Sequence, residues 1–509
     1  MRFAILVRLL TVLCLVAGAP SRADEPDGRR PLFHFTPTNN FINDPNGLVF
    51  VGGEYHLFYQ HNPEGDRWGH MSWGHAVSRD LVRWEHLPIA LREADGIMIF
   101  SGSAVFDAQN SSGLGRDDAP PMVAIYTGAG HEKQTQNLAS SLDRGRTWTK
   151  FAGNPVLDLN SNAFRDPKVF WHKPSHRWLM VTVLADERKV RLWGSKDLKN
   201  WEKLSDFGPA GATKGVWECP ELFEAPVEGA GNDESRWVLK VDVGDGAPFG
   251  GSGGQYFVGG FDGKEFRPEG AGNDPLWIDF GKDFYASQSW NDAPGDGRPV
   301  WIAWMNNWQY ANEIPTSPWR GAMTIVRAMS LRKTTDGLRL VQSPVEGLKA
   351  IRRQHHKIEG RSIPAGETQL NAEGVEGLAL EVILEFEHGD AEDFGLKVRC
   401  GDGEETVIGV DRRAQTVYVD RSHSGNVNFS PHFAGRHSAH LSIGDGSQLV
   451  RLHVIVDATS VEVFADAGRL VLTDQIFPRP GSQAVRLFAT GGAARLRSLE
   501  AWKLAPQTL

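Results

Sequence analysis

The chain has 509 residues, which is too long for one ordinary core and predicts two domains. Its 54 Lys and Arg against 63 Asp and Glu give a net charge of −9, and no basic cluster is long enough to follow a phosphate backbone. Nucleic acid is therefore not an expected partner. The 56 Gly, 17 Trp and 26 Phe predict short strands and turns with aromatic faces that can stack on sugars.

Residues 1–23 have the features of an export signal. Two arginines precede an apolar run from Leu9 to Ala19, and small residues precede Asp24, so we expect cleavage after Ala23. The run is shorter than the ~20 residues that a membrane span needs. We therefore expect a secreted or periplasmic protein that has no contact with a membrane after the signal is removed.

The segment Asn43-Asp44-Pro45-Asn46-Gly47 is predicted to hold a carboxylate in a tight bend before an alternating strand at 48–51. Pro45 and Gly47 are the residues that predict the bend. A carboxylate fixed next to a strand suits a nucleophile or a group that binds sugar hydroxyls. Taken alone, the segment is more simply a hairpin turn.

Two further fragments in the same half of the chain present an acid in a similar way. Asp166 lies directly before a proline in the Phe-Arg-Asp-Pro segment 164–167, and Glu218 lies two residues before one in the Trp-Glu-Cys-Pro segment 217–220. Both fragments lie in surroundings rich in tryptophan. Three acids presented alike predict a shared pocket.

A weak repeat predicts the architecture of the first domain. Each copy is a strand, a small turn with Asp and then an aromatic residue, and the copies recur at intervals of about 50 to 65 residues. They lie at 78–84, 141–148, 195–201 and 261–266. Strand patterns with no helix between them predict the blades of a β-propeller. Four visible blades and a closing one predict a five-bladed propeller over residues 31–340, with its site at the axial mouth.

The remainder of the chain is predicted to be a linker and a second domain. Residues 341–356 show helical spacing after a proline and predict a linker helix. Strands such as 379–386 and 450–456 recur at short intervals from 357 to 509, with Gly and Asp turns between them. This pattern is typical of a β-sandwich, so the fold class is all-β.

Cysteine and histidine usage indicates neither a disulfide framework nor a metal site. Cys14 lies in the predicted signal, and Cys219 and Cys400 are far apart, so a disulfide between them is not expected. The histidines lack the spacing of metal ligands, and no metal or cofactor is expected. Cys219 has two open interpretations, a thiol that tunes Glu218 or a small core residue.

At these residues the chain resembles glycoside hydrolase family 32, the β-fructosidases that include invertases, exo-inulinases and levanases. The resemblance extends over nearly all of the chain after the signal, and segments 250–259 and 304–320 look most like microbial exo-inulinases and levanases. Besides the three acidic segments, the motifs that carry it are at 57–63, 68–69, 100–103, 283–287, 304–310, 420–427 and 460–464.

The resemblance implies a five-bladed propeller followed by a β-sandwich, and it implies a role for each acid. Asp44 would be the nucleophile, Glu218 the general acid and then base, and Asp166 the group that holds ring hydroxyls in the transition state, with retention of configuration. We expect Asp44 to lie among donors, and Glu218 to be buried beside Trp217 and Pro220 so that it starts protonated. The implied substrate-binding residues are Asn43, Gln60, Trp68, Phe100, Ser101, Arg165, Cys219, Tyr285 and Trp308.

The leading hypothesis is an exported exo-β-fructosidase that acts on levan or inulin, and on sucrose. Fructosyl transfer and release of levanbiose are alternatives on the same scaffold. A non-catalytic fructan-binding propeller would be expected to lack one acid, but all three are present. A propeller enzyme for another furanose, such as an arabinosidase, is disfavoured by the Asn-Asp-Pro-Asn-Gly and Glu-Cys motifs. The sequence leaves linkage preference and oligomeric state open.

Overall fold

The structure is a computed structural model that describes residues 28–116, 119–229, 234–270, 274–443 and 449–506. The predicted export signal lies outside the described residues. Strands make up most of the described chain, and its helices are short 3-10 turns. These turns are η2 (Lys173–Ser175), η3 (Ala185–Glu187), η4 (Glu346–Ile351), η5 (Asn371–Glu373) and η6 (Asp466–Gly468).

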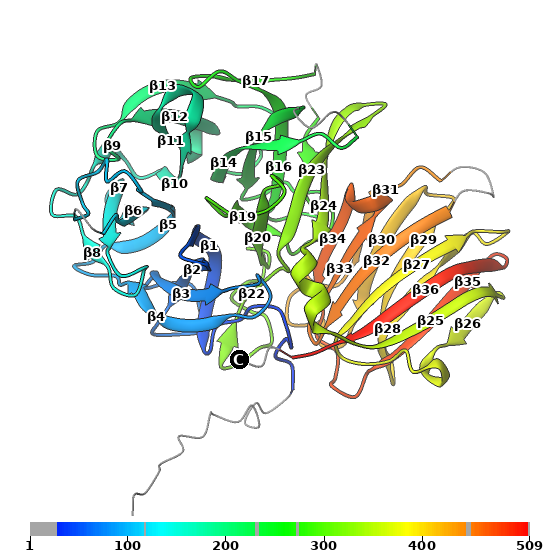
Figure 1. The fold of residues 1–509 in the computed structure, drawn as a ribbon. Coiled ribbons are helices and arrows are strands. Elements are labelled where there is room, and N and C mark those ends of the chain that lie inside the picture. Colours follow the sequence, from blue (N-terminus) through cyan, green and yellow to red (C-terminus); the bar gives the residue numbers. More distant parts are fainter. Residues whose placement is uncertain (1–27, 117–118, 230–233, 271–273, 444–448, 507–509) are drawn as a thin grey trace, which may run out of the picture.

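Residues 40–344 form five separate sheets, which Figure 1 shows arranged in a ring around a common centre. The first sheet contains β21 (Trp319–Arg320), β1 (Asn40–Val51), β2 (Glu54–Asn62), β3 (Ser72–Ser78) and β4 (Glu85–Leu91). The second contains β5 (Met98–Phe106), β6 (Met122–Ala129), β7 (Gln134–Ser141), β8 (Thr149–Lys150) and β9 (Leu157–Ser161). The third contains β10 (Phe164–His172), β11 (Arg177–Leu184), β12 (Lys189–Ser195) and β13 (Glu202–Phe207).

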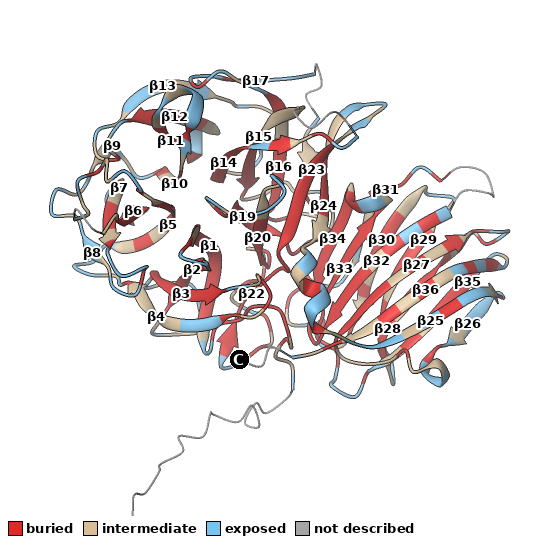
Figure 2. Cartoon of the chain, viewed as in Figure 1, coloured by how far each residue is buried: buried red, intermediate tan, exposed pale blue. Residues whose placement is uncertain are grey.

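The last two sheets of the ring complete the circle back to β1. The fourth contains β14 (Trp217–Pro226), β15 (Ser235–Val243), β16 (Gly253–Phe261), β17 (Phe266–Pro268) and β18 (Leu276–Trp277). The fifth contains β19 (Tyr285–Ser289), β20 (Val300–Met305), β22 (Ala322–Met323), β23 (Arg327–Thr334) and β24 (Gly337–Pro344). The strands β1, β5, β10, β14 and β19 lie nearest the centre (Figure 1), and Figure 2 shows them largely buried.

The four copies of the sequence repeat have one structural role. Each forms the turn between the third and fourth strands of a sheet, for example between β3 and β4. There Asp80 Oδ1 accepts the backbone N–H groups of Val82 and Arg83 at 3.0 and 2.8 Å. Asp197 does the same for Lys199 and Asn200. The aspartate therefore recurs because its side chain replaces the hydrogen bonds that a turn leaves unmade.

Residues 352–504 form two six-stranded sheets, and the two sheets share one apolar core. One sheet contains β25 (Arg352–Ile363), β36 (Ala494–Leu504), β27 (Leu380–Glu387), β32 (Leu449–Asp457), β33 (Ser460–Ala465) and β34 (Leu470–Gln475). The other contains β26 (Gly366–Gln369), β35 (Ala484–Thr490), β28 (Asp393–Gly401), β29 (Glu404–Asp411), β30 (Thr416–His423) and β31 (Arg436–His440). The all-β fold is thus consistent with a β-propeller followed by a β-sandwich.

The linker helix predicted over 341–356 is wrong in its extent. The strand β24 continues to Pro344, η4 occupies only Glu346–Ile351, and β25 begins at Arg352. Within η4 the apolar Leu348 and Ile351 are buried, and their spacing of three suits a 3-10 turn. The helix stops because the residues that follow pair with β36.

Buried polar groups join the ring to the sandwich. Arg421 of β30 lies 2.5 Å from Asp283, whose other oxygen accepts the hydroxyl of Tyr310 at 2.6 Å. A second cluster forms around Arg327 of β23, which bonds to Glu462 of β33. Asp283, Tyr310 and Glu462 come from segments that the sequence grouped with the family motifs. They hold the two parts of the chain together.

Candidate active site

The innermost strand of each ring sheet has the same irregularity near its start. At this point the inner strand advances by three residues while the paired strand advances by two. The one extra residue is the signature of a β-bulge. The bulges lie between Ile42 and Pro45, Ile99 and Gly102, Arg165 and Lys168, Glu218 and Glu221, and Tyr285 and Gln288. A bulge redirects side chains, so all five inner strands present their first residues in the same irregular way.

The bend predicted around Asp44 is not a hairpin turn. Residues 43–47 lie within β1, which bulges between Ile42 and Pro45 and again between Asn46 and Val49. Gly47 has a φ of +58°, and a Cβ atom there would lie 2.5 Å from the ring of Phe58. Because β1 remains paired with β2 on both sides of the motif, these residues do not form a hairpin. Gly47 instead belongs to the second bulge, where the backbone lies close to the ring of Phe58.

Asp44 is buried among donors, as expected from the sequence. Ser101 Oγ donates to its Oδ2 at 2.6 Å, Asn43 Nδ2 donates to its Oδ1 at 2.9 Å, and the thiol of Cys219 donates to Oδ2 at 3.5 Å. Burial raises the pKa of Asp44 and the charge of Glu218 raises it further, whereas the three donors lower it. The donors therefore favour the charged form against the effect of burial.

Asp166 and Cys219 are linked across neighbouring sheets. The backbone N–H of Cys219 donates to Asp166 Oδ2 at 2.9 Å, and the N–H of Asp166 itself donates to Thr127 Oγ1 at 2.9 Å. Both residues have left-handed backbones, with φ of 61° and 46°. Burial raises the pKa of Asp166 to about 7, with Arg165 opposing and Glu218 reinforcing the shift. Such strained positions are typical of functional sites.

Glu218 forms hydrogen bonds with two neighbouring side chains and is not deeply buried. The expectation that Glu218 is buried is therefore wrong. Its side chain is 24% exposed, against 4% for that of Asp166. Arg165 donates to its Oε1 from Nε and Nη2, at 3.2 and 3.1 Å, and the hydroxyl of Tyr285 donates to its Oε2. The neighbour Trp217 is fully buried and belongs to the packing between the third and fourth sheets.

Besides Ser101, four of the predicted substrate-binding residues lie on or beside β1, β2 and β5. Gln60 is buried and donates from Nε2 to the carbonyl of Ile99 at 2.9 Å. Trp68 is 43% exposed and meets the half-buried ring of Phe100 edge-on, with 6.0 Å between centroids. Asn43 contributes a buried Oδ1 that has no partner among the described residues. Of these four residues, Asn43 bonds directly to Asp44.

Trp308 is connected to the site by Trp304. The two rings are 4.7 Å apart, and Trp304 in turn meets the ring of Tyr285 at 6.4 Å. The backbone N–H of Trp308 donates to Ser252 Oγ at 3.1 Å, which fixes the loop after β20 against the fourth sheet. Trp308 is therefore held by contacts with both the fourth and the fifth sheets.

Three residues near the acids, Asp242, Lys240 and Thr127, were not predicted from the sequence. Asp242 and Lys240 of β15 are both fully buried and lie 2.5 Å apart, and Asp242 is the ladder partner of Glu218. Burial raises the pKa of Asp242 to about 7, although Lys240 opposes the shift. The sequence does contain a signal for this residue, because Asp242 is a single aspartate within the apolar run Val241-Asp242-Val243. Thr127, which holds Asp166, gave no signal because its role depends on the neighbouring sheet.

Comparison with protein families identifies the chain. Residues 34–344 match the glycosyl hydrolases family 32 N-terminal domain, and residues 347–503 match the glycosyl hydrolases family 32 C-terminal domain. The chain belongs to glycosyl hydrolase family 32. The resemblance drawn from the motifs is confirmed, and this family 32 chain is a glycoside hydrolase.

Individual family 32 proteins resemble the chain over nearly its whole length. A levanase of Bacillus subtilis (strain 168) is 47% identical over 501 residues, which cover 97% of this chain and 73% of the relative. The extracellular exo-inulinase inuE of Aspergillus ficuum is 40% identical, with 96% of each chain covered. The crystal structure of an exo-inulinase from Aspergillus awamori superposes with a TM-score of 0.88 at 39% identity, covering 95% of this chain and 99% of that one.

A ligand complex is also among the similar structures. The fructofuranosidase of Schwanniomyces occidentalis, solved with fructose, has a TM-score of 0.87 at 34% identity and covers 94% of this chain and 98% of its own. In the part of the chain that the structure describes, no helix is long and apolar enough to cross a membrane.

Proposed function

We propose that this chain is an exo-β-fructosidase that releases terminal fructose from levan or inulin and also cleaves sucrose. The observation that carries the proposal is the cluster of Asp44, Asp166 and Glu218 on β1, β10 and β14, each held by different donors. The names of the relatives, levanase and exo-inulinase, support the choice of substrate. The ring is, in this proposal, a five-bladed propeller with the three acids at its axis.

The proposed reaction uses the acids in two steps. Asp44 attacks the anomeric carbon of the terminal fructosyl unit while Glu218 gives a proton to the departing oxygen. Glu218 then takes a proton from water, whose oxygen displaces Asp44 and restores the starting carboxylate, so configuration is retained. Asp166 accepts hydrogen bonds from ring hydroxyls. Arg165 and Tyr285, which bond to Glu218, hold that carboxylate in place for both proton transfers.

The proposed fructose pocket explains exo action. The unpartnered Oδ1 of Asn43 is free to accept a sugar hydroxyl, and Trp68 and Trp308 supply apolar walls. A pocket that encloses the terminal ring leaves no room for a chain continuing beyond it. Gln60, Phe100, Ser101 and Cys219 complete the proposed enclosure.

We also propose that the protein is exported, on the basis of residues 1–23 and the extracellular naming of the Aspergillus exo-inulinase. Secretion is tested by locating the processed protein in cell fractions of the source organism. A protein that retains residues 1–23 in the cytoplasm would contradict export without affecting the catalytic proposal.

Product analysis tests the catalytic proposal directly. The enzyme is incubated separately with levan, inulin and sucrose, and the released sugars are separated by chromatography over time, with Asp44→Asn as the inactive control. Fructose is expected as the first product from each substrate. Early levanbiose would indicate a donor pocket for two residues, an early ladder of oligomers would indicate endo cleavage, and longer fructans formed from sucrose would indicate transfer.

A further inference from the structure

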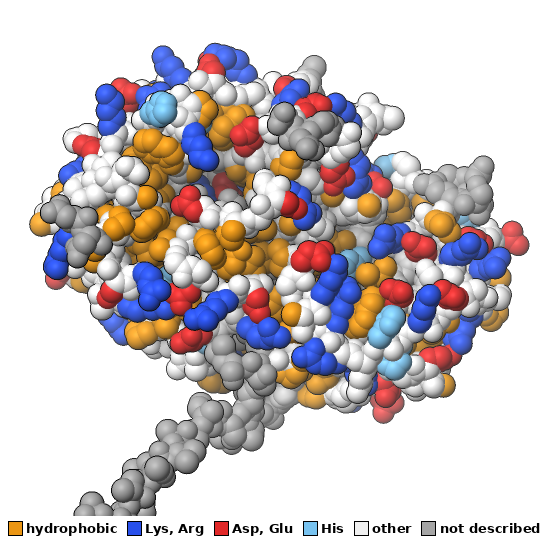
Figure 3. Space-filling view, viewed as in Figure 1, with side chains coloured by type: hydrophobic (Ala, Val, Ile, Leu, Met, Phe, Trp, Pro, Cys, Tyr) orange, Lys and Arg blue, Asp and Glu red, His pale blue; other side chains and the backbone are white. Residues whose placement is uncertain are grey.

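A second cavity of about 520 Å³ opens at the ends of the inner strands that lie opposite to the three acids. In β10, Asp166 is the third residue and Trp171 the eighth, which places them roughly 16 Å apart along the strand. Trp171 lines the cavity together with the last residues of β5 and residues of β14 and β19. Figure 3 shows the face of the ring hollowed at its centre, with hydrophobic side chains around the opening.

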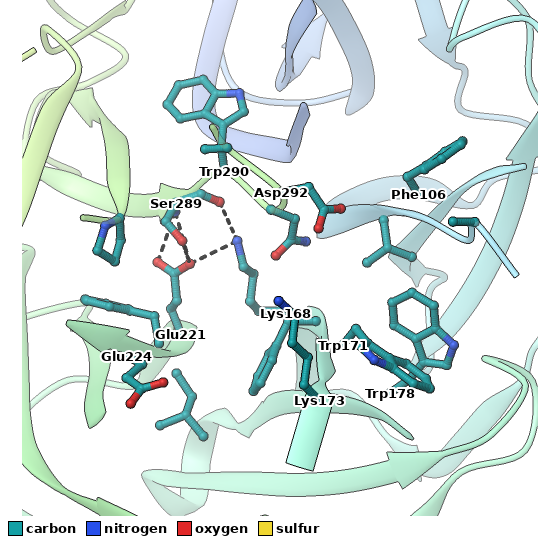
Figure 4. Close-up of a pocket in the computed structure, with 18 of the residues that line it drawn as sticks. Phe106, Lys168, Trp171, Lys173, Trp178, Glu221, Glu224, Ser289, Trp290 and Asp292 are labelled. Atoms are coloured by element: carbon teal, nitrogen blue, oxygen red, sulfur yellow. Dashed lines mark hydrogen bonds and ion pairs between the residues drawn. The ribbon is translucent and has the colours of Figure 1, made fainter. Parts of the chain in front are cut away.

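Buried residues joined by an ion pair and hydrogen bonds line the base of this cavity. Lys168 Nζ lies 2.9 Å from Glu221 and donates to the carbonyl of Ser289 at 2.5 Å. Glu221 also accepts the hydroxyl of Ser289 at 2.6 Å. Figure 4 shows these three residues joined across the base of the cavity. None of Asp44, Asp166 and Glu218 lines the cavity, so it is distinct from the fructose pocket.

One wall is an exposed aromatic platform that is rigidly supported. The side chain of Trp171 is 41% exposed, although it is large and apolar. It packs edge-on against the buried Trp178 at 5.1 Å, and Trp178 is fixed by its indole N–H, which donates to Ser111 Oγ at 2.9 Å. Phe106 lines the same cavity from β5. An indole held in this way can stack on the C–H face of a sugar with little loss of side-chain entropy.

Polar groups of both charges surround the platform. Lys173, Glu224 and Asp292 line the cavity, and Figure 4 shows them around the space in front of the aromatic rings. Burial raises the pKa of Asp292, and the positive charge of Lys173 opposes this shift. Glu224 uses one oxygen to accept the hydroxyl of Ser235. Together these residues supply donors and acceptors without an excess of positive charge, which suits a neutral polyhydroxyl ligand better than an anion.

We propose that this cavity is a second carbohydrate site that binds a segment of the fructan chain away from the hydrolysed end. The inference rests on the proposed function, since fructan is the polymer assigned to the catalytic end. The volume suits a small number of sugar rings, because ligand cavities span roughly 300 to 1,000 Å³. A segment bound here would keep the enzyme on a polymer between cleavage events. Hydrolysis of sucrose would not benefit from this binding.

Native gel electrophoresis in the presence of levan, inulin or dextran tests the binding. All proteins carry Asp44→Asn so that the polymer is not digested, and Trp171→Ala is compared with Trp171→Phe and with Leu142→Ala. Leu142 is a matched control, because it is 39% exposed and does not line the cavity. We expect Trp171→Ala alone to lose most of the retardation by fructan, and Trp171→Phe to retain it. Melting temperatures check that each variant is folded.

Kinetics of variants with Asp44 intact provide the second measurement. Trp171→Ala is expected to raise KM for levan or inulin about fivefold, the effect of losing one stacking contact, and to leave kcat/KM for sucrose within about twofold. Unchanged retardation and unchanged KM for polymer would overturn the second site. Loss of retardation by dextran but not by fructan would also overturn it, because the ligand would then be another glycan.

The same experiments separate this inference from the proposed function. A wild-type enzyme that cleaves sucrose and fructan while Trp171→Ala behaves identically would refute only the second site. A wild-type enzyme that releases no fructose from any substrate would refute the proposed function. Retardation by fructan that depends on Trp171 would then still support the carbohydrate site.

Discussion

The hydroxyl of Ser101 donates a hydrogen bond of 2.6 Å to Asp44, and the two residues occupy equivalent places in the bulges of neighbouring sheets. This bond lowers the pKa of Asp44, while burial raises it. The repeated bulge therefore supplies both the acid and a hydrogen bond that favours its charged form.

Ser101→Ala is expected to raise the pKa of Asp44 and to move the acidic limb of the kcat/KM profile to higher pH. Activity should fall about tenfold to a hundredfold, because a hydrogen bond to a charged group is lost. The measurement is a pH–rate profile on sucrose. Ser103→Ala is the matched control, since Ser103 lies two residues further along β5 and bonds only to backbone groups. An equal response of both variants would contradict a specific role for Ser101.

Cys219 is predicted to act on Asp44 as a protonated thiol. Burial, reinforced by Asp44 and Asp166, raises the pKa of this thiol well above its usual value, so it remains a donor at neutral pH. Cys219→Ala should move the acidic limb to higher pH, and Cys219→Ser, which keeps a donor, should not. A purely packed cysteine would instead lower the melting temperature in both variants and leave the profile in place.

Substrates with a good leaving group should distinguish the two catalytic acids. Glu218→Gln is expected to lose about 10²- to 10⁴-fold in turnover of sucrose and to recover part of the first step with an activated fructoside, which needs no proton. Asp44→Asn should lose about 10⁴-fold or more on both substrates. Burst and steady-state rates measure the two steps. Near wild-type turnover in either variant would refute the assignment.

Trp308→Ala should weaken binding of the terminal fructose through loss of an apolar wall. The expected cost is about 1 to 3 kcal/mol in transition-state binding, seen in kcat/KM for every fructan and for sucrose alike. This response differs from that of Trp171→Ala, which should spare sucrose. If Trp308→Ala matched the wild type on all substrates, the wall of the fructose pocket would lie elsewhere.

Stability should decline at alkaline pH because of His34. Burial would lower the pKa of this histidine, but hydrogen bonds and charges from Asp457 and Glu462, each 2.8 Å away, raise it to about 9. A raised pKa stabilises the fold fully below pH 6.5, and this contribution, about 3 kcal/mol, is lost as the pH rises through about 9.

Urea unfolding midpoints between pH 6 and 10 measure this effect. The wild type should lose stability over that range, and His34→Gln should be less stable at pH 6 but show a flatter dependence. His355→Gln, at an exposed histidine of β25, is the control and should follow the wild type. A wild-type curve with no decline toward pH 10 would contradict a charged His34 in the folded protein.

Features that depend on near neighbours in the chain could be predicted from the sequence. The Asp turns of the repeat, the strand-rich composition and the three acidic segments were all visible, because a turn aspartate bonds to groups two or three residues away. The motifs also identified the family, which the comparisons confirm. Asp44, Asp166 and Glu218 could therefore be named as candidate catalytic residues from the sequence by itself.

The tertiary structure alone decided how those residues are used. Closing the ring of sheets brings Ser101 to Asp44 and Arg165 to Glu218, pairs that are 57 and 53 residues apart. It leaves Glu218 partly exposed where local sequence had predicted burial, and it turns the Asp283 motif into a domain contact with Arg421. These outcomes depend on packing between sheets. The strand that lies opposite a side chain determines how far it is buried and which groups it contacts, and the local sequence does not encode which strand that is.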